Sequence, residues 1–494
     1  MRKKLKLLLL AILVALPVTE GFAKERELKV MENSVVKTYM NFTKEIDPAN
    51  IVTMADLELS VALASPLVTF NKERQIVAAL AEKWINIEDN KIKFVLRKDL
   101  KWSDGSVVTA LQFKDALERA RKLYSNDLKA LFDSIQKIET LDGNSLIITT
   151  KNSILKSGLL LKLTEPMYGL MAITNGKLDL SKTAGPFYVE KSDANNIRLR
   201  ANKNWYEYSS EMPQVVEIKR LPKDIDVVAN FKNDEWANLI SGTSLMKIDI
   251  KKKMDDGGFK TWQRTLDKVF SFFPSKRFLD RGGSNFVKAL ASKLNREDVL
   301  EGFSGYTIAN QFFPRGYELW SPEDPKTKTT EKFDGHSNIH VIIPDNSYAA
   351  ALKDNLQKTL SSVMGVKIEC TLIPVTEISN YLKKGNFDLL AGGLAVADPN
   401  FEGAMSFFIE RDPPFISSTL TPNDFSVQMT KARSLPTSKE RAAKMREIII
   451  AAQEAGHVLP LFHFSSLAIA KPGIDLSEVP NSDETVLFSK VRMR

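Results

Sequence analysis

Short runs in which apolar and polar residues alternate predict several strands in the first half of the chain. Lys91 to Arg97 alternates in this way and predicts one strand. The pair Asp104-Gly105 predicts a turn, because glycine adopts a positive φ without steric cost, and Thr109 can cap a helix over residues 111–121. A second alternating stretch over residues 138–148 contains Asp-Gly-Asn and predicts a β-hairpin.

The second half alternates segments of strand and helix character. Apolar runs predict strands at residues 340–344, 366–373 and 386–393, and the spacing of apolar residues predicts helices over 348–363 and 378–382. A capping-box pattern at 437–440 predicts a long helix ending near residue 455, and residues 459–464 predict a further strand. A β-α-β-α-β order is typical of a parallel, doubly wound sheet, so we expect an α/β fold.

The N-terminus has the pattern of an export signal. Four basic residues within positions 2–6 precede an unbroken apolar run over residues 7–16, and small residues end at Ala23. We therefore expect residues 1–23 to be a signal peptide, cleaved before Lys24 in a Gram-negative type of export to the periplasm. The run is shorter than the roughly 20 residues of a membrane-spanning helix, and no cysteine follows it to carry a lipid. An uncleaved N-terminal anchor is the alternative; otherwise we expect no stable membrane insertion.

Composition excludes several classes of protein. With 494 residues the chain is too long for a single core, so two or three domains are expected. The formal net charge is +8, but the lysines are scattered among acidic residues, which argues against nucleic-acid binding. Cys370 is the only cysteine, so no intrachain disulfide can form, and its strand-like surroundings predict a buried, inert thiol.

No motif of an enzyme or of a metal site stands out. His336 and His340 have a spacing that binds metal on a helix, but they lie in a loop that enters a strand, where alternate faces separate them. We therefore expect no catalytic residue, no metal and no cofactor. A hydrolase whose residues lie far apart in the sequence remains the alternative function.

Five separated segments resemble one family, and they occur in that family's order. The clearest runs from Lys101 to Ala110 and reads KWSDGSVVTA; the others include Gly185-Pro186, the Asn202-x-x-Trp205 spacing and the Pro-Leu-Phe-His run before Phe464. Together they resemble the family 5 extracellular solute-binding proteins, the periplasmic oligopeptide- and dipeptide-binding receptors of ABC importers. The resemblance implies a two-lobed periplasmic binding protein (type II, cluster C-like), with an extra subdomain in the first lobe and a hinge that closes the ligand cleft.

The resemblance also implies domain boundaries and partners. Lobe 1 would comprise residues 24–50, 183–268 and 478–494, the inserted subdomain residues 51–182, and lobe 2 residues 269–477. The partners would be a peptide or another small solute and an inner-membrane ABC permease, and the protein would act as a monomer without catalysis. A family member that signals to a regulatory partner instead of feeding a transporter is a further alternative.

Candidate ligand-binding residues follow from the rule that ligands bind beyond the carboxyl ends of parallel strands. For each aromatic residue among them, ordinary core packing is an equally good interpretation. The candidates are Asn33, Ser34, Phe270, Phe272, Leu394, Ala395, Asp398, Phe462 and Phe464.

The resemblance further concerns an aspartate that receives a peptide's amino terminus in the family. Aligning Asp398-Pro399 with the family's Asp-Pro places Ala395 at that position and also matches Phe401 to a family aromatic residue. Aligning Ala397-Asp398 with the family's Ala-Asp keeps Asp398 as the anchor but shifts the alignment by three residues. We favour the first alignment, which predicts that a free amino terminus lacks its carboxylate partner.

Overall fold

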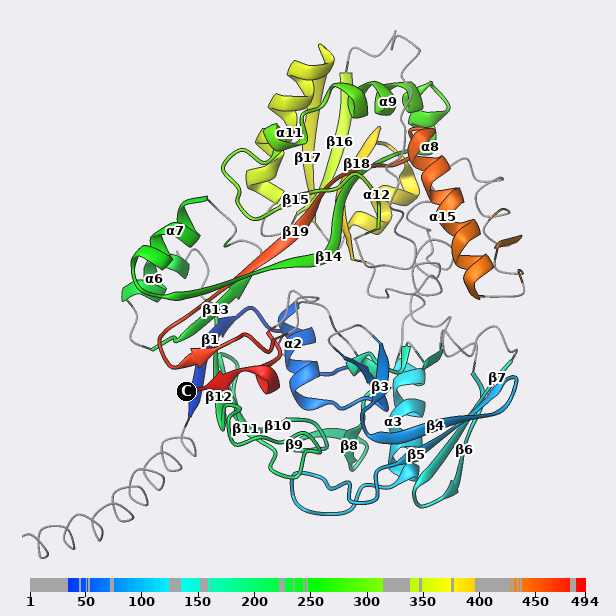
Figure 1. Ribbon diagram of the computed structural model, residues 1–494, viewed down its shortest axis with the longest axis vertical. Coiled ribbons are helices and arrows are strands. Elements are labelled where there is room, and N and C mark those ends of the chain that lie inside the picture. Colours follow the sequence, from blue (N-terminus) through cyan, green and yellow to red (C-terminus); the bar gives the residue numbers. More distant parts are fainter. Residues whose placement is uncertain are drawn as a thin grey trace, which may run out of the picture.

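The fold has two lobes, an inserted subdomain and a ribbon of two long strands that passes between the lobes (Figure 1). The computed structural model describes residues 34–43, 46–49, 51, 54–71, 75–123, 135–151, 159–160, 162–221, 227–233, 236–242, 245, 248–313, 338–345, 349–374, 377–395, 428, 431–432, 435, 438–479 and 486–494. Within these ranges no helix combines the length and the apolar character needed to cross a bilayer.

The first lobe is built on a four-stranded mixed sheet in the order β1-β12-β11-β10. β1 (Val35–Met40) runs parallel to β12 (Val215–Arg220), whereas β11 (Asn196–Ala201) is antiparallel to both β12 and β10 (Phe187–Ser192). Alternate residues of β1 are buried, and they pack with α2 (Met54–Leu63) in one core. The sheet and α2 thus share a single core.

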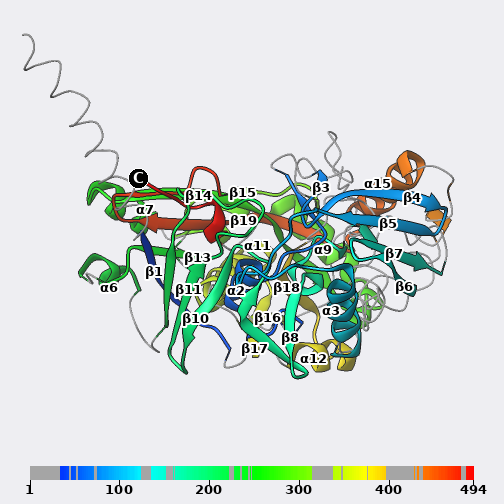
Figure 2. The same ribbon diagram turned by 90° about the horizontal axis from the view of Figure 1, so that it is seen from below.

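The inserted subdomain has its own antiparallel sheet and core. Its strands follow the order β4 (Ala81–Glu88), β5 (Lys91–Leu96), β7 (Ser145–Thr150) and β6 (Ile135–Asp142), and α3 (Ala110–Leu123) packs on them. Thr109 begins α3 as predicted: its backbone N–H donates to Gln112 Oε1 at 2.9 Å, while its hydroxyl accepts from the Gln112 N–H at 3.4 Å. Figure 2 shows this sheet and the β10-β11 sheet toward opposite ends of the molecule.

The second lobe is built on a seven-stranded sheet that contains the predicted parallel strands. β16 (Asn338–Asp345) is parallel to both β17 (Lys367–Pro374) and β18 (Leu389–Ala395). The order is β13 (Leu239–Gly242), β19 (Leu459–Ala470), β14 (Lys260–Pro274), β18, β16 and β17, and the seventh strand, β15 (Thr307–Ile308), pairs with β19. One face packs on α9 (Gly283–Lys293) and α11 (Ala349–Met364). The other face packs on α12 (Ile378–Lys384) and α15 (Ser438–Glu454), so the doubly wound arrangement is confirmed.

Two strands belong to both lobes. β14 (Lys260–Pro274) and β19 (Leu459–Ala470) pair antiparallel along most of their length, and Figure 1 shows them running from the lower lobe into the upper one. Phe270 and Phe462 pack in the second core, whereas Ala468 packs in the first. The register shifts between Thr265 and Val269 and again between Phe270 and Ser271.

One part of the expected lobe 2 packs elsewhere. Residues 269–477 were assigned to that lobe, but Ala468, Ala470, Ile474 and Leu476 pack in the core of the first lobe. The chain therefore returns to the first lobe within β19, before residue 477. β19 is one strand that is buried along nearly all of its length, so no break in the strand marks this boundary.

The remaining elements are short and complete the two lobes. They are β2 (Val68–Phe70), β3 (Ile76–Ala78), β8 (Met171–Thr174), β9 (Lys177–Thr183), α6 (Val227–Asn233), β13 (Leu239–Gly242), α7 (Ile248–Asp256), α8 (Lys276–Leu279), α10 (Arg296–Val299), β15 (Thr307–Ile308), β20 (Ile474–Asp475), β21 (Arg492–Met493) and the 3₁₀ turns Pro166–Tyr168 and Phe488–Lys490.

Candidate functional site

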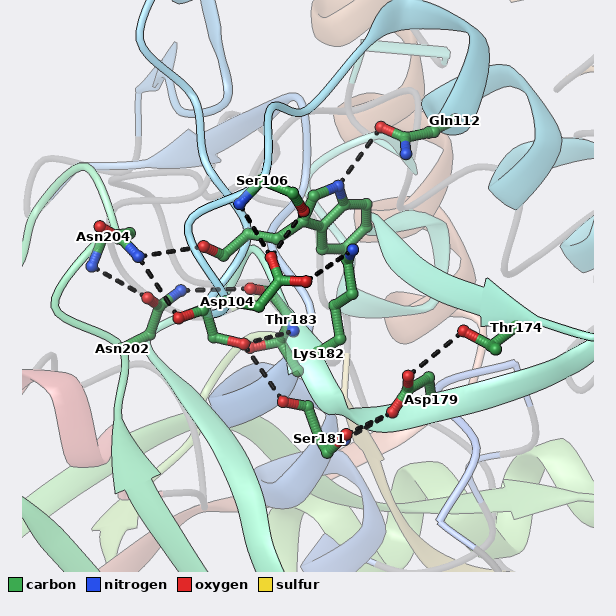
Figure 3. A network of polar contacts seen from close by, with 12 residues as sticks. Asp104, Ser106, Gln112, Thr174, Asp179, Ser181, Lys182, Thr183, Asn202 and Asn204 are labelled. Carbon is green, nitrogen blue, oxygen red and sulfur yellow. Dashed lines mark hydrogen bonds and ion pairs between the residues drawn. The ribbon is translucent and has the colours of Figure 1, made fainter.

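The segment that carries the clearest family resemblance forms a structural clasp between the subdomain and the first lobe (Figure 3). Asp104 accepts hydrogen bonds from the Ser106 N–H at 2.9 Å and hydroxyl at 2.6 Å, and its other oxygen lies 2.8 Å from Lys182 Nζ on β9. The Lys182 and Ser106 contacts lower the pKa of Asp104 to about 2. Gly105 has a φ of 84°, as the predicted turn requires.

Asparagines from a second resembling segment complete this clasp. Asn204 Nδ2 donates to the Trp102 carbonyl at 3.1 Å, and Asn202 Nδ2 donates to the Gly185 carbonyl at 2.9 Å. A Cβ on Gly185 would lie 2.2 Å from the Leu63 carbonyl oxygen, so this position requires glycine for close backbone approach. Two of the segments that indicate the family therefore bind each other, and their contacts are those of a joint between domains.

The candidate ligand-binding region lies instead where the two lobes meet on the β14-β18-β19 part of the sheet. Phe270 pairs with Gly393 on one side and Phe462 on the other, and Lys268 pairs with Ala395. We call this region, residues 264–270, 393–395 and 462–466, the inter-lobe site. Of the nine predicted residues, the sheet brings six together: Phe270, Phe272, Leu394, Ala395, Phe462 and Phe464.

The four aromatic candidates are core residues in this structure. Phe270 and Phe462 stack with ring centres 4.9 Å apart, and Phe464 packs edge-on against both rings. None of these rings, nor Phe272, is more than 1% exposed. They therefore belong to the buried core next to the inter-lobe site. A ligand would contact residues beside them and not these rings.

The other candidates lie apart from this region or outside the described residues. The Ser34 carbonyl accepts hydrogen bonds from the Gln214 and Val215 N–H groups, both at 3.1 Å, which fixes the start of β1 against β12. Asn33 and Asp398 fall outside the described residues, as does His336. Among the described residues, no three His, Cys, Asp or Glu side chains gather as metal ligands would.

Charged residues that the sequence did not single out lie on β14 within the inter-lobe site. Arg264 is 4% exposed, and its charge favours ionisation of Glu58 on α2. Burial nevertheless raises the pKa of Glu58 to about 8, against the lowering effects of a hydrogen bond from the Val486 N–H at 3.2 Å and of Arg264. The alternation Lys268-Val269-Phe270 could have placed Lys268 on the same face of β14 as Phe270.

Two further titratable groups are uncharged near neutral pH. Burial lowers the pKa of His463 to about 4, so its imidazole is neutral at physiological pH. Burial also raises the pKa of Cys370 on β17 to about 12, and its side chain is 5% exposed, which confirms the prediction of a buried thiol. Neither group has the environment of a nucleophile or of a general base near neutral pH.

A cavity of about 400 Å³ lies at the other end of β18, away from the lobe junction. It is lined by Ser275, Lys276, Arg277, Leu382, Lys383, Gly385 and Phe387. Because ligands of parallel sheets bind at the carboxyl ends of the strands, this position at the amino end of β18 is the less favourable candidate.

Comparisons with known proteins agree with this architecture. The model of the bacterial extracellular solute-binding proteins, family 5 (middle region) matches residues 75–411. The periplasmic murein peptide-binding protein MppA of Escherichia coli K12 is 36% identical over 75 residues, which cover 15% of this chain and 14% of that protein. The structure of NikA from Brucella suis in complex with Fe(III)-EDTA has a TM-score of 0.80 at 16% identity and covers 93% of this chain and 100% of that chain. The structure of Haemophilus influenzae OppA in complex with RPPGFSPFR has a TM-score of 0.69 at 15% identity, and the match covers 94% of this chain and 99% of that chain.

Proposed function

We propose that this protein, which belongs to family 5 of the bacterial extracellular solute-binding proteins, is the periplasmic substrate-binding component of an ABC importer. Proteins of this family bind solutes and are not enzymes, so the chain is a binding protein and the hydrolase alternative has no support. Its task would be to bind a peptide or peptide-like solute between the lobes and to deliver it to an inner-membrane permease.

The observation that carries this proposal is the ribbon formed by β14 and β19. Its residues are anchored in both cores, and its pairing is irregular between Thr265 and Val269 and again between Phe270 and Ser271. A short irregular segment between two regular ones can absorb the backbone rotations of a hinge, while each lobe moves as a rigid body. Closure around a solute would be the signal that the permease recognises.

The fold alone does not determine the ligand, so the proposed ligand class needs an argument of its own. Related proteins are described as binding a murein peptide, the peptide RPPGFSPFR or Fe(III)-EDTA, so one scaffold accepts chemically different solutes. We propose a peptide or peptide-like solute. The family's peptide receptors bind the ligand through hydrogen bonds to protein main chain, and β18 ends beside the inter-lobe site. Ala395 at the end of β18 favours a ligand without a free ammonium group there, with Asp398 as the alternative anchor.

Export and assembly belong to the same proposal. The family is typically periplasmic or extracellular, and the N-terminal pattern supports cleavage of residues 1–23 and release of a monomer into the periplasm. A role in signalling to a regulatory partner is the alternative use of the same closure.

The test combines stability and shape. A solute that binds only the closed native state adds about 2.7 kcal/mol to the free energy of unfolding at a hundredfold excess over Kd. Differential scanning calorimetry with a library of peptides and small solutes should reveal a compound that raises the melting temperature by several degrees. The same compound should lower the radius of gyration measured by X-ray scattering. A library that produces neither change contradicts a receptor function.

A further inference from the structure

The cavity of about 400 Å³ in the second lobe lies at the amino end of β18, opposite to the end that borders the inter-lobe site. One wall is formed where β14 leads into α8, and the other where α12 leads into β18. The seven residues of β18 separate the two regions by about 20 Å. All residues that line the cavity belong to the second lobe (Figure 1), so a ligand could bind there without closure of the lobes.

The walls of the cavity are fixed relative to each other. The Ser275 N–H donates to the Asp388 carbonyl at 2.8 Å, and the Ser275 hydroxyl donates to the Phe387 carbonyl at 2.6 Å. Leu382 and Phe387 are 7% and 3% exposed and pack in one core, so the apolar part of the lining is held in place. A Cβ on Gly385 would meet no atom within 4 Å, so the space beside it is open.

The rim of the cavity carries three exposed cationic side chains, Lys276, Arg277 and Lys383. Lys276 Nζ is paired with Asp280 at 2.7 Å. Within the part of the chain that the structure describes, Arg277 and Lys383 have no carboxylate partner. These two cations come from different elements, α8 and α12, and both border the same space.

The buried carboxylate nearest to the cavity is already engaged. Asp388 accepts from Arg281 Nη2 at 2.5 Å and from the His340 N–H at 3.0 Å, so both of its oxygens have donors. The charge that Arg277 and Lys383 bring to the rim is therefore not balanced by Asp388. Two like charges beside one cavity favour an anion placed between them.

A ligand for this cavity must match both parts of its lining. An anionic group would gain charge-assisted hydrogen bonds from two side chains, and Arg277 could bind a carboxylate or phosphate through two N–H groups. An apolar body would lie against Leu382 and Phe387 and be removed from water. The volume falls in the range of about 300–1,000 Å³ that is typical of small-molecule sites.

We propose that this cavity is a second binding site, which takes a soluble organic anion. A carboxylate or phosphate head contacts Arg277 and Lys383, and an apolar body contacts Leu382 and Phe387. This site goes beyond the proposed function, because its occupation requires neither lobe closure nor a transported solute.

Hexyl phosphate, hexanol and inorganic phosphate test the two parts of the ligand separately. Hexanol keeps the apolar body without the charge, and inorganic phosphate keeps the charge without the body. Isothermal titration calorimetry on the mature protein, at about 150 mM salt to screen long-range attraction, should show hexyl phosphate binding about tenfold or more tightly than either. X-ray scattering on the saturated protein should show an unchanged radius of gyration, because the ligand contacts one lobe.

The double variant Arg277→Gln/Lys383→Gln should lose about tenfold or more of the affinity for hexyl phosphate and change that for hexanol by less than about twofold. The matched control is Lys293→Gln/Lys358→Gln, which removes the same charge from α9 and α11 on the opposite face of the sheet. It should keep the wild-type affinity for hexyl phosphate. All four side chains are exposed, and circular dichroism and melting temperature establish that both variants are folded.

Three results would overturn the proposal: hexyl phosphate binding no more tightly than hexanol or inorganic phosphate, an affinity that survives Arg277→Gln/Lys383→Gln, or an equal loss in both double variants. A radius of gyration that falls with hexyl phosphate would place the compound between the lobes and would also refute this cavity as its site. Mass spectrometry of solute released from the denatured wild type tests the receptor function independently, so either proposal can fail without the other.

Discussion

Replacing Glu58 by glutamine should remove one source of pH dependence from the protein's stability. Glu58 lies on α2 of the first lobe, near Arg264 on β14. Burial raises the pKa of Glu58 from 4.5 to about 8, although the Val486 N–H and the charge of Arg264 favour the ionised form. The folded protein therefore binds this proton more tightly than the unfolded chain does. The free energy of unfolding must then fall as pH rises from about 4.5 to about 8, because ionisation costs more in the folded state.

The size of the effect follows from the pKa difference. Each pKa unit corresponds to about 1.4 kcal/mol, so the full difference would be worth about 5 kcal/mol above pH 8. Glu58 keeps partial contact with solvent, which reduces the expected penalty to about 2 kcal/mol. Glutamine retains an acceptor for the Val486 N–H and cannot ionise, so Glu58→Gln should match the wild type within about 1 kcal/mol at pH 5 and exceed it by about 2 kcal/mol at pH 8.5.

The assay is calorimetric unfolding of wild type and Glu58→Gln at pH 5, 6.5, 7.5 and 8.5. Glu82→Gln is the matched control, because Glu82 is an exposed carboxylate on β4 of the subdomain. The difference in melting temperature between Glu58→Gln and wild type should grow steadily with pH, while that for Glu82→Gln stays constant. Parallel pH profiles for all three proteins would refute the burial argument. A variant that is less stable than wild type at pH 8.5 would show that attraction between Arg264 and ionised Glu58 outweighs burial.

Three further outcomes are expected. Gly185→Ala would force its Cβ against the Leu63 carbonyl oxygen at 2.2 Å, so scanning calorimetry should show a loss of about 1–3 kcal/mol, and an unchanged melting temperature would contradict the close approach. Ala395→Asp should create binding of a free-amine peptide over its N-acetylated twin in calorimetry, whereas a wild-type preference for the free amine that Asp398→Ala abolishes would identify Asp398 as the anchor. The mature protein should begin at Lys24 and be recovered soluble from the periplasm, and N-terminal sequencing that finds an intact Met1 on a membrane-bound form would contradict this.

Local patterns in the sequence predicted the elements of the fold well where one physical signal dominated. The short, largely apolar segments of β16, β17 and β18 favour strands, and the apolar residues of the helices between them recur every three or four positions. Gly365 follows α11 with a φ of 67°, which favours glycine, so the end of this helix has a local signal in the sequence. The crossing of β19 between lobes was not predictable in this way, because β19 enters both cores as one unbroken strand that is buried along nearly all of its length.

The sequence indicated that several candidate residues lie on neighbouring strands, but not which of their side chains are buried. The rule for strand ends identified Leu394 and Ala395, and the sheet pairs them with β14 as expected of a common site. Whether Phe270 faces a ligand or a core depends on which helices cover that face, which no local pattern reveals, and the core reading holds in this structure. Lys268 was not singled out because a lone lysine before an apolar run is normally a solvated residue; the register places it opposite Ala395.

The central claim is that this protein carries a solute between its lobes, and the solute itself is the most direct test. The mature protein, purified from the periplasm without refolding, should release close to one equivalent of a small compound on denaturation. Mass spectrometry should identify that compound, and adding it back to the stripped protein should restore the melting temperature and reduce the radius of gyration. Protein that releases no compound, and whose shape and stability respond to no member of a broad peptide and solute library, would contradict the account.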